Sequence, residues 1–192
     1  MALRVPKAEL TTGLSESMIK QFGVVPEPLE VTWNNPKVAE ASLELGGKVS
    51  EWDAADASLK SFAHMAVSAQ VGCSFCLDVG YFKAQNQDLD MAKASQVPRW
   101  RESEVFTPLE RDVLEYAEAM TTTPPTVTDE LSARLLDRLG PAAMIELTVF
   151  SAFSNFSTRS NTALGDRVAG LLLCVRDSAG RPSGDCGVAS TP

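Results

Sequence analysis

The sequence contains no apolar run of the ~20 residues that are needed to cross a bilayer. Residues 1–14 also lack the apolar stretch of a secretory signal peptide. Basic residues are few: 17 Lys and Arg stand against 25 Asp and Glu, which leaves a formal net charge of -8. An acidic chain of this kind is a poor partner for nucleic acid or for an anionic membrane. We therefore expect a cytoplasmic protein that binds neither.

Alternating strand patterns joined by hairpin turns are also missing, whereas apolar residues recur every three or four positions. This pattern predicts an all-α, compact single-domain fold over residues 1–170. Pro26 and Pro28 predict an extended segment from Val24 to Asn35. Residues 171–192 are rich in Gly, Ser, Pro and Asp and are expected to form a flexible C-terminal tail. Helices are expected over 14–22, 36–49, 53–71, 73–85, 88–95, 107–120, 129–139 and 141–165.

Four cysteines are present, and two of them form the CxxC of Val71-Gly72-Cys73-Ser74-Phe75-Cys76. Gly72 is expected to end one helix, so that Cys73 or Ser74 begins the next. A helix N-terminus favours thiolate over thiol, and thiolates attack peroxides and disulfides. Two inert, buried cysteines are the alternative. A zinc site would require Cys174 and Cys186, which do not form a second CxxC, so we expect no metal.

Several segments together resemble a known family, that of carboxymuconolactone decarboxylase and alkylhydroperoxidase D-like proteins. The resemblance extends over about residues 15–165. It is carried by Lys60, Ala66-Val67-Ser68, Gly72-Cys73-Ser74-Phe75-Cys76, Thr107-Pro108-Leu109-Glu110-Arg111, Ala117-Glu118-Ala119-Met120, Glu146-Leu147, Asn155 through Arg159, Asn161, Ala163 and Gly165.

The resemblance implies an all-helical, alkylhydroperoxidase D-like fold that assembles into a homo-oligomer, a dimer or trimer, and needs no cofactor. Its peroxidase members use the CxxC as a redox pair. Carried over to this sequence, Cys76 attacks a peroxide or an organic hydroperoxide and Cys73 resolves the product. An unidentified thiol or dithiol reductant would then restore the pair. The protein would be a peroxiredoxin-like antioxidant enzyme.

The sequence departs from this family at the two positions of the proton relay. Ser61 stands where the peroxidase members have a glutamate, and Gly80 stands where they have a histidine. Neither residue is a base at neutral pH. Ser61 could instead orient a water or a hydroxyl-bearing substrate. Gly80, inside a predicted helix, is expected to mark a close helix contact.

Two other residues are candidates for the missing base. His64 is the only histidine, and it lies one helical turn beyond Ser61. It could point at Cys76 from the neighbouring helix, or it could be a hydrogen-bonded core residue. Asp78 could be a partly protonated base, although a nearby carboxylate raises a thiol pKa. The simpler interpretation is that Asp78 interacts with the positive first turn of its helix.

Three functions are compatible with these residues. The first is a thiol-dependent peroxidase or disulfide oxidoreductase with Cys76 and Cys73 as the redox pair. The second is a cofactor-free decarboxylase of a carboxymuconolactone-like molecule. The third is a helical oligomer that has lost catalysis. Three polar residues of the last helix either line a pocket or interface, or hydrogen-bond between helices in the core. These are Asn155, Arg159 and Asn161.

Overall fold

The structure, a computed structural model, describes residues 3–86 and 89–165. Only helices and their connections occur within these ranges, which confirms the all-α prediction. None of the described helices is long and apolar enough to span a membrane. The elements are α1 (Thr12–Phe22), α2 (Glu27–Thr32), α3 (Pro36–Ser50), α4 (Ala57–Val71), α5 (Ser74–Asn86), α6 (Met91–Gln96), the 3-10 helix η1 (Val97–Glu102), α7 (Pro108–Thr121) and α8 (Asp129–Leu164).

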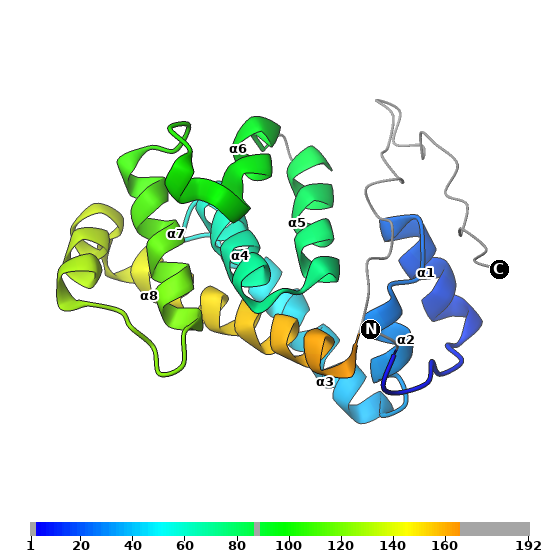
Figure 1. The fold of residues 1–192 in the computed structure, drawn as a ribbon. Helices are drawn as coiled ribbons and strands as arrows, with labels where there is room; N and C mark the ends of the chain where they lie inside the picture. Colours follow the sequence, from blue (N-terminus) through cyan, green and yellow to red (C-terminus); the bar gives the residue numbers. More distant parts are fainter. Residues whose placement is uncertain (1–2, 87–88, 166–192) are drawn as a thin grey trace.

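Helix α4 is the centre of the core, because α5, α7 and α8 all pack against it. Its apolar residues occur around most of its circumference, as expected of a helix that is covered on several sides. Phe62 and Met65 of α4 are almost fully buried, together with Leu114 of α7 and Leu147 of α8. Figure 1 shows α1 and α2 to one side of the group formed by α4 to α8.

The segment expected to be extended between residues 24 and 35 is partly helical, so that prediction is wrong. Pro26 precedes α2 as its N-cap residue, and Pro28 falls in the first turn of the helix. Proline is tolerated there because the backbone N–H groups of a first turn have no partner within the helix. The two prolines therefore mark the start of a short helix instead of preventing one.

Most other helix boundaries were predicted closely. Gly23 and Gly72 end α1 and α4 in the left-handed conformation, and Thr107 forms the expected capping box at the start of α7. Helix α4 begins later than expected, after Asp56. The two helices expected between 129 and 165 form one element with a break at Gly140, which has a φ of 73°. Residue 88, the predicted tail at 171–192, Cys174 and Cys186 lie outside the described residues.

A buried ion pair connects α4 to α8 and to the loop that precedes α4. Lys60 Nζ lies 2.6 Å from Glu146 Oε1 and also donates to the carbonyl oxygen of Trp52. Glu146 Oε2 accepts a 2.7 Å hydrogen bond from the backbone N–H of Ala54. Burial by itself raises the pKa of Glu146, but these hydrogen bonds outweigh it and lower the pKa. Removing either partner would leave a buried charge without its counterion.

Helices α4 and α5 approach each other closely at Gly80. A Cβ added to Gly80 would lie 2.6 Å from Cγ of Met65 and 3.8 Å from Cδ2 of His64. No ordinary van der Waals contact is that short, so any side chain at position 80 would have to displace Met65. The expectation that Gly80 marks a close helix contact is therefore confirmed.

Gly80→Ala should lower the free energy of unfolding by about 1–3 kcal/mol, because the added methyl group overpacks the contact with Met65. Gly47→Ala in α3 is the matched control, since a Cβ there meets no atom within 4 Å. Gly47→Ala should stabilise the helix by about 0.5–1 kcal/mol. Urea denaturation of both variants measures the difference. Equal stabilisation of the two variants would contradict a close contact at Gly80.

Candidate functional site

The CxxC lies at the turn between α4 and α5. Gly72 ends α4 with a φ of 77°, and the backbone N–H groups of Gly72 and Cys73 both donate to the Ser68 carbonyl oxygen over 3.0 Å. A residue with a side chain would be strained at that φ, so the sequence requires glycine where the chain reverses. Cys73 directly precedes the first residue of α5, and Cys76 lies in the first turn of that helix.

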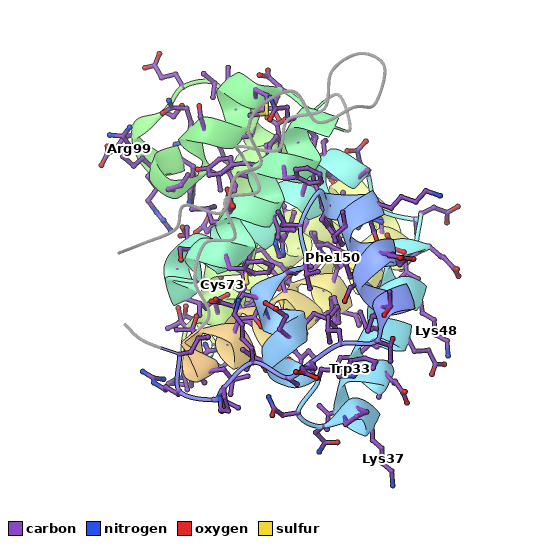
Figure 2. All side chains as sticks on the ribbon, turned by 90° about the vertical axis from the view of Figure 1, so that its right-hand side faces the viewer. Trp33, Lys37, Lys48, Cys73, Arg99 and Phe150 are labelled. Carbon is purple, nitrogen blue, oxygen red and sulfur yellow. A yellow bond between two sulfur atoms is a disulfide. The ribbon has the colours of Figure 1, made fainter. Side chains whose placement is uncertain are left out.

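Cys73 and Cys76 are bonded to each other as a disulfide, with their Cα atoms 5.3 Å apart. Each residue is only 3% exposed. Cys73 is labelled in Figure 2, where it lies among the packed side chains. Phe75 and Phe82 are buried with the two cysteines, and Phe22 of α1 packs against the same cluster. The pair is therefore enclosed by aromatic side chains from α1 and α5.

Each sulfur of the pair has an N–H donor. The backbone N–H of Cys76 points at Sγ of Cys73 over 3.2 Å. The amide Nδ2 of Asn161, on α8, donates to Sγ of Cys76 over 3.3 Å. Such donors, together with the N-terminal end of α5, favour the thiolate over the thiol when the disulfide is reduced.

His64 contacts the backbone of Cys76. Its Nε2 lies 3.2 Å from the Cys76 carbonyl oxygen, and its Nδ1 lies 3.3 Å from Oγ of Ser154. A carbonyl oxygen can only accept, so Nε2 carries the proton. The one hydroxyl proton of Ser154 lies between two acceptors, Nδ1 of His64 and the Phe150 carbonyl oxygen at 3.0 Å.

The charge state of His64 follows from its surroundings. Burial lowers its pKa to about 4, and the Lys83 cation acts in the same direction, although the hydrogen bond to Cys76 opposes both. His64 is therefore a neutral imidazole at pH 7.

Ser61 and Asp78 are the other two proposed site residues. Ser61 is partly exposed on α4 and makes no hydrogen bond to either cysteine within residues 3–86 and 89–165. Asp78 is buried, 4% exposed, and lies about 200° around α5 from Cys76. Asp78 lies just beyond the first turn of α5, which itself contains no acidic residue. The structure therefore brings Cys73, Cys76 and His64 together.

The contacts of two residues were not anticipated from the sequence. Asn155, Arg159 and Asn161 were expected either to line a pocket or interface, or to hydrogen-bond between helices. The second alternative holds for Asn155 and Arg159, which bond to Thr121 at the end of α7 and so connect α7 with α8. The first of the two residues is Asn161, which lies about 200° around the helix from Arg159, an offset that could have separated it from the other two. The second residue is Lys83, whose charge acts on His64.

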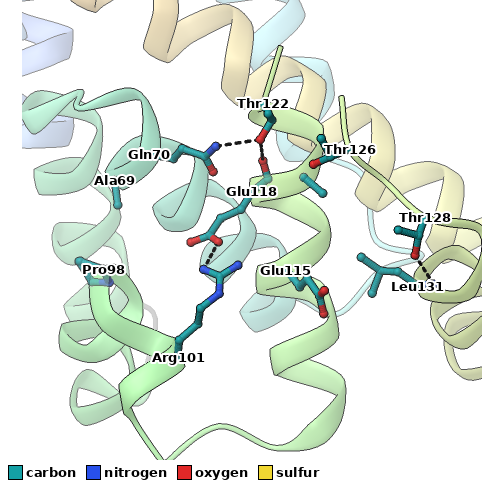
Figure 3. A pocket seen from close by; sticks show the side chains of 11 residues that line it. Ala69, Gln70, Pro98, Arg101, Glu115, Glu118, Thr122, Thr126, Thr128 and Leu131 are labelled. Atoms are coloured by element: carbon teal, nitrogen blue, oxygen red, sulfur yellow. Dashed lines mark hydrogen bonds and ion pairs between the residues drawn. The ribbon is translucent and has the colours of Figure 1, made fainter. Parts of the chain in front are cut away.

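A pocket of about 550 Å³ lies away from the cysteine pair, between α4, α7 and the chain around residue 100. Figure 3 shows that some of its polar side chains bond to one another. Glu118 pairs with Arg101, and Gln70 donates to Oγ1 of Thr122 over 3.2 Å. Neither cysteine nor His64 lines this pocket. Within residues 3–86 and 89–165, no group of three or more His, Cys, Asp or Glu could hold a metal ion.

The single imidazole should titrate with a pKa of about 4, well below the usual 6.5. Between these values the unfolded chain binds the proton and the folded chain does not, so stability falls as the pH falls. The free energy of unfolding should drop by about 2 kcal/mol from pH 7 to pH 5. His64→Gln should remove most of this slope. NMR measures the pKa of the imidazole, and denaturation at pH 7 and pH 5 measures the change in stability. An imidazole pKa near 6.5 would contradict a buried, neutral His64.

Comparison with known proteins gives a match to one family and identifies the fold. The model of the carboxymuconolactone decarboxylase family matches residues 36–119, which include both cysteines. The uncharacterized protein YnjA of Escherichia coli K12 is 35% identical over 116 residues, which cover 60% of this chain and 64% of YnjA. The chain thus spans somewhat less than two thirds of that relative.

Solved structures are similar over most of the chain. A variant of the debrominase Bmp8, in complex with 2,3,4-tribromopyrrole, superposes with a TM-score of 0.77 at 20% identity, over 89% of this chain and 94% of Bmp8. A peroxidase-related protein with an alkylhydroperoxidase AhpD core, from Ralstonia eutropha JMP134, gives 0.75 at 17% identity, over 88% and 93% of the two chains. Residues 36–119 therefore match the carboxymuconolactone decarboxylase family model, and the chain has the alkylhydroperoxidase D-like fold.

Proposed function

We propose that this protein is a thiol-dependent oxidoreductase that reduces a peroxide or an organic hydroperoxide, with Cys76 as the attacking residue and Cys73 as the resolving one. The observation that carries the proposal is the Cys73–Cys76 disulfide at the start of α5, with an N–H donor on each sulfur. The family resemblance assigns the order of the two cysteines. Peroxidase-related proteins of the same fold support the choice of substrate.

The proposed cycle balances with one external dithiol. The Cys76 thiolate attacks one peroxide oxygen and breaks the O–O bond, so that the other oxygen leaves and becomes an alcohol or water. Cys76 is then a sulfenic acid. The Cys73 thiolate attacks Sγ of Cys76, hydroxide leaves and is protonated to water, and the disulfide forms. The dithiol reductant supplies two electrons and two protons to restore both thiols.

In this proposal, hydrogen-bond donors activate Cys76 by stabilising its thiolate, and no side chain acts as a base. Asn161 stabilises the thiolate through its amide N–H, and the first turn of α5 adds its partial positive charge. His64 is a positioning residue, since its Nε2–H holds the Cys76 carbonyl oxygen. With a pKa of about 4, its imidazole is too weak a base to remove a thiol proton efficiently.

The redox proposal is tested in a Cys174→Ser/Cys186→Ser background, in which only the CxxC thiols remain. After reduction, hydrogen peroxide or cumene hydroperoxide should consume two thiols per chain and form the Cys73–Cys76 disulfide. Cys76→Ser should abolish the reaction. Cys73→Ser should stop it at a sulfenic acid that dimedone traps. Thiol titration and mass spectrometry follow each step.

Two further variants and a second oxidant sharpen this test. Asn161→Leu should slow the reaction about tenfold at neutral pH, because a hydrogen bond to a charged group is worth about 1.5–3 kcal/mol. Ser160→Ala, on the exposed side of the same helix, should leave the rate unchanged. Unchanged thiols after peroxide would overturn the proposal. If the disulfide formed with 2,3,4-tribromopyrrole but not with peroxide, the oxidising substrate would be a halogenated pyrrole and the peroxide proposal would be wrong.

We also propose that the protein is a homo-oligomer, as the resemblance implies. Ile145, Val149 and Phe156 lie on one stripe of α8 and are 66%, 45% and 50% exposed. An exposed apolar stripe of this kind is typical of a protein–protein contact. A second copy of the chain would cover it.

Ile145→Glu should shift the protein to the monomer, because it places a charge in the contact. Light scattering coupled to size-exclusion chromatography measures the mass. Leu136→Glu is the control, since Leu136 is 47% exposed but lies on the other side of the break at Gly140. A wild-type monomer, or an oligomer that survives Ile145→Glu, would refute this contact.

A further inference from the structure

A cavity of about 300 Å³ lies between α5 and the N-terminal helices α1, α2 and α3. Its wall is mostly apolar: α5 contributes Phe75 and Val79, which share the cavity with Phe22 of α1, Leu29 of α2 and Leu43 of α3. Ligand cavities in proteins are typically of about 300–1,000 Å³ and mostly apolar. This cavity is therefore large enough for a small organic molecule.

The cavity is next to the cysteine pair. Phe22 and Val79 line it and also pack against the cluster that contains Cys73 and Cys76. Lys83, which lines the cavity as well, is seven residues beyond Cys76 on α5. Seven residues make almost two full turns, so these two residues lie on nearly the same face of the helix, about 10 Å apart along its axis.

Lys83 is the one charged side chain among the described residues that line the cavity. It makes no hydrogen bond or ion pair within residues 3–86 and 89–165. Much of the side chain is exposed, yet the protein atoms around its ammonium lower its pKa from the ordinary lysine value. A cation in such surroundings is stabilised by an anion that joins it.

We propose that this cavity binds an amphipathic organic acid, whose apolar part fills the space beside Phe22 and Val79 and whose carboxylate pairs with Lys83. The proposal rests on the redox function above, since the substrate would be a hydroperoxide of such an acid. The spacing along α5 sets its length: the carboxylate and the hydroperoxide lie about 10 Å apart, as in a medium-chain acid oxidised near its far end.

Binding of octanoate and octan-1-ol to the oxidised protein, measured by calorimetry, tests the site without any redox step. The wild type should bind octanoate more tightly than octanol. Lys83→Met should weaken octanoate binding about tenfold and leave the affinity for octanol unchanged. Lys83→Arg should restore octanoate binding. Lys48→Met is the matched control, because Lys48 is exposed on α3 (Figure 2), pairs with Glu44 and does not line the cavity.

Val79→Trp should abolish binding of both ligands, because the indole fills the cavity. Circular dichroism verifies that each variant is folded. Equal octanoate affinity in the wild type and Lys83→Met, or no octanoate binding by the wild type, would overturn the proposal. Octanoate binding that depends on Lys83 in a protein whose thiols ignore peroxide would refute the redox function alone. Peroxide-driven disulfide formation without octanoate binding would refute the cavity assignment alone.

Discussion

The close approach of α4 and α5 at Gly80 determines the rest of the site. Because position 80 has no side chain, Met65 fits directly against the backbone of α5. At this separation His64, the preceding residue of α4, reaches the carbonyl oxygen of Cys76. The residues of α5 that line the apolar cavity, Phe75, Val79 and Lys83, lie about 60–140° around the helix from Gly80. One missing side chain thus permits the contact through which His64 holds Cys76.

Among the described residues, the groups that hydrogen-bond to the two sulfurs are neutral donors and not bases. Burial keeps His64 neutral, and the nearby Lys83 cation disfavours a second positive charge. The donors to the two sulfurs are an amide of Asn161 and a backbone N–H, both neutral. These neutral N–H donors stabilise a thiolate and do not themselves titrate, so their effect on the thiol pKa does not change with pH. Ionisation of the thiols themselves would then set the pH dependence of the reaction.

The sequence was sufficient for features that depend on neighbouring residues. The left-handed Gly72, the capping box of Thr107 and the start of α5 at the CxxC each follow from local backbone chemistry. The sequence was misleading between residues 24 and 35, because proline disfavours a helix interior but not a first turn. Contacts between distant helices were not predictable. The bond from Asn161 to Cys76 depends on how α8 packs against α5, and the place of Lys83 in the cavity depends on how α1 packs against α5.

Gly80 stands where the resemblance implies a relay histidine, and the packing around it excludes that side chain. A histidine placed at residue 80 would have its Cβ 2.6 Å from Met65 Cγ, so it could not enter this packing unless Met65 became smaller. His64 already lies beside that position, with its Cδ2 3.8 Å from the same point. The imidazole of this sequence therefore approaches α5 from α4, and it binds the backbone carbonyl oxygen of Cys76 instead of a sulfur. Discrimination among substrates would then depend on the cavity and its lysine and not on a proton relay.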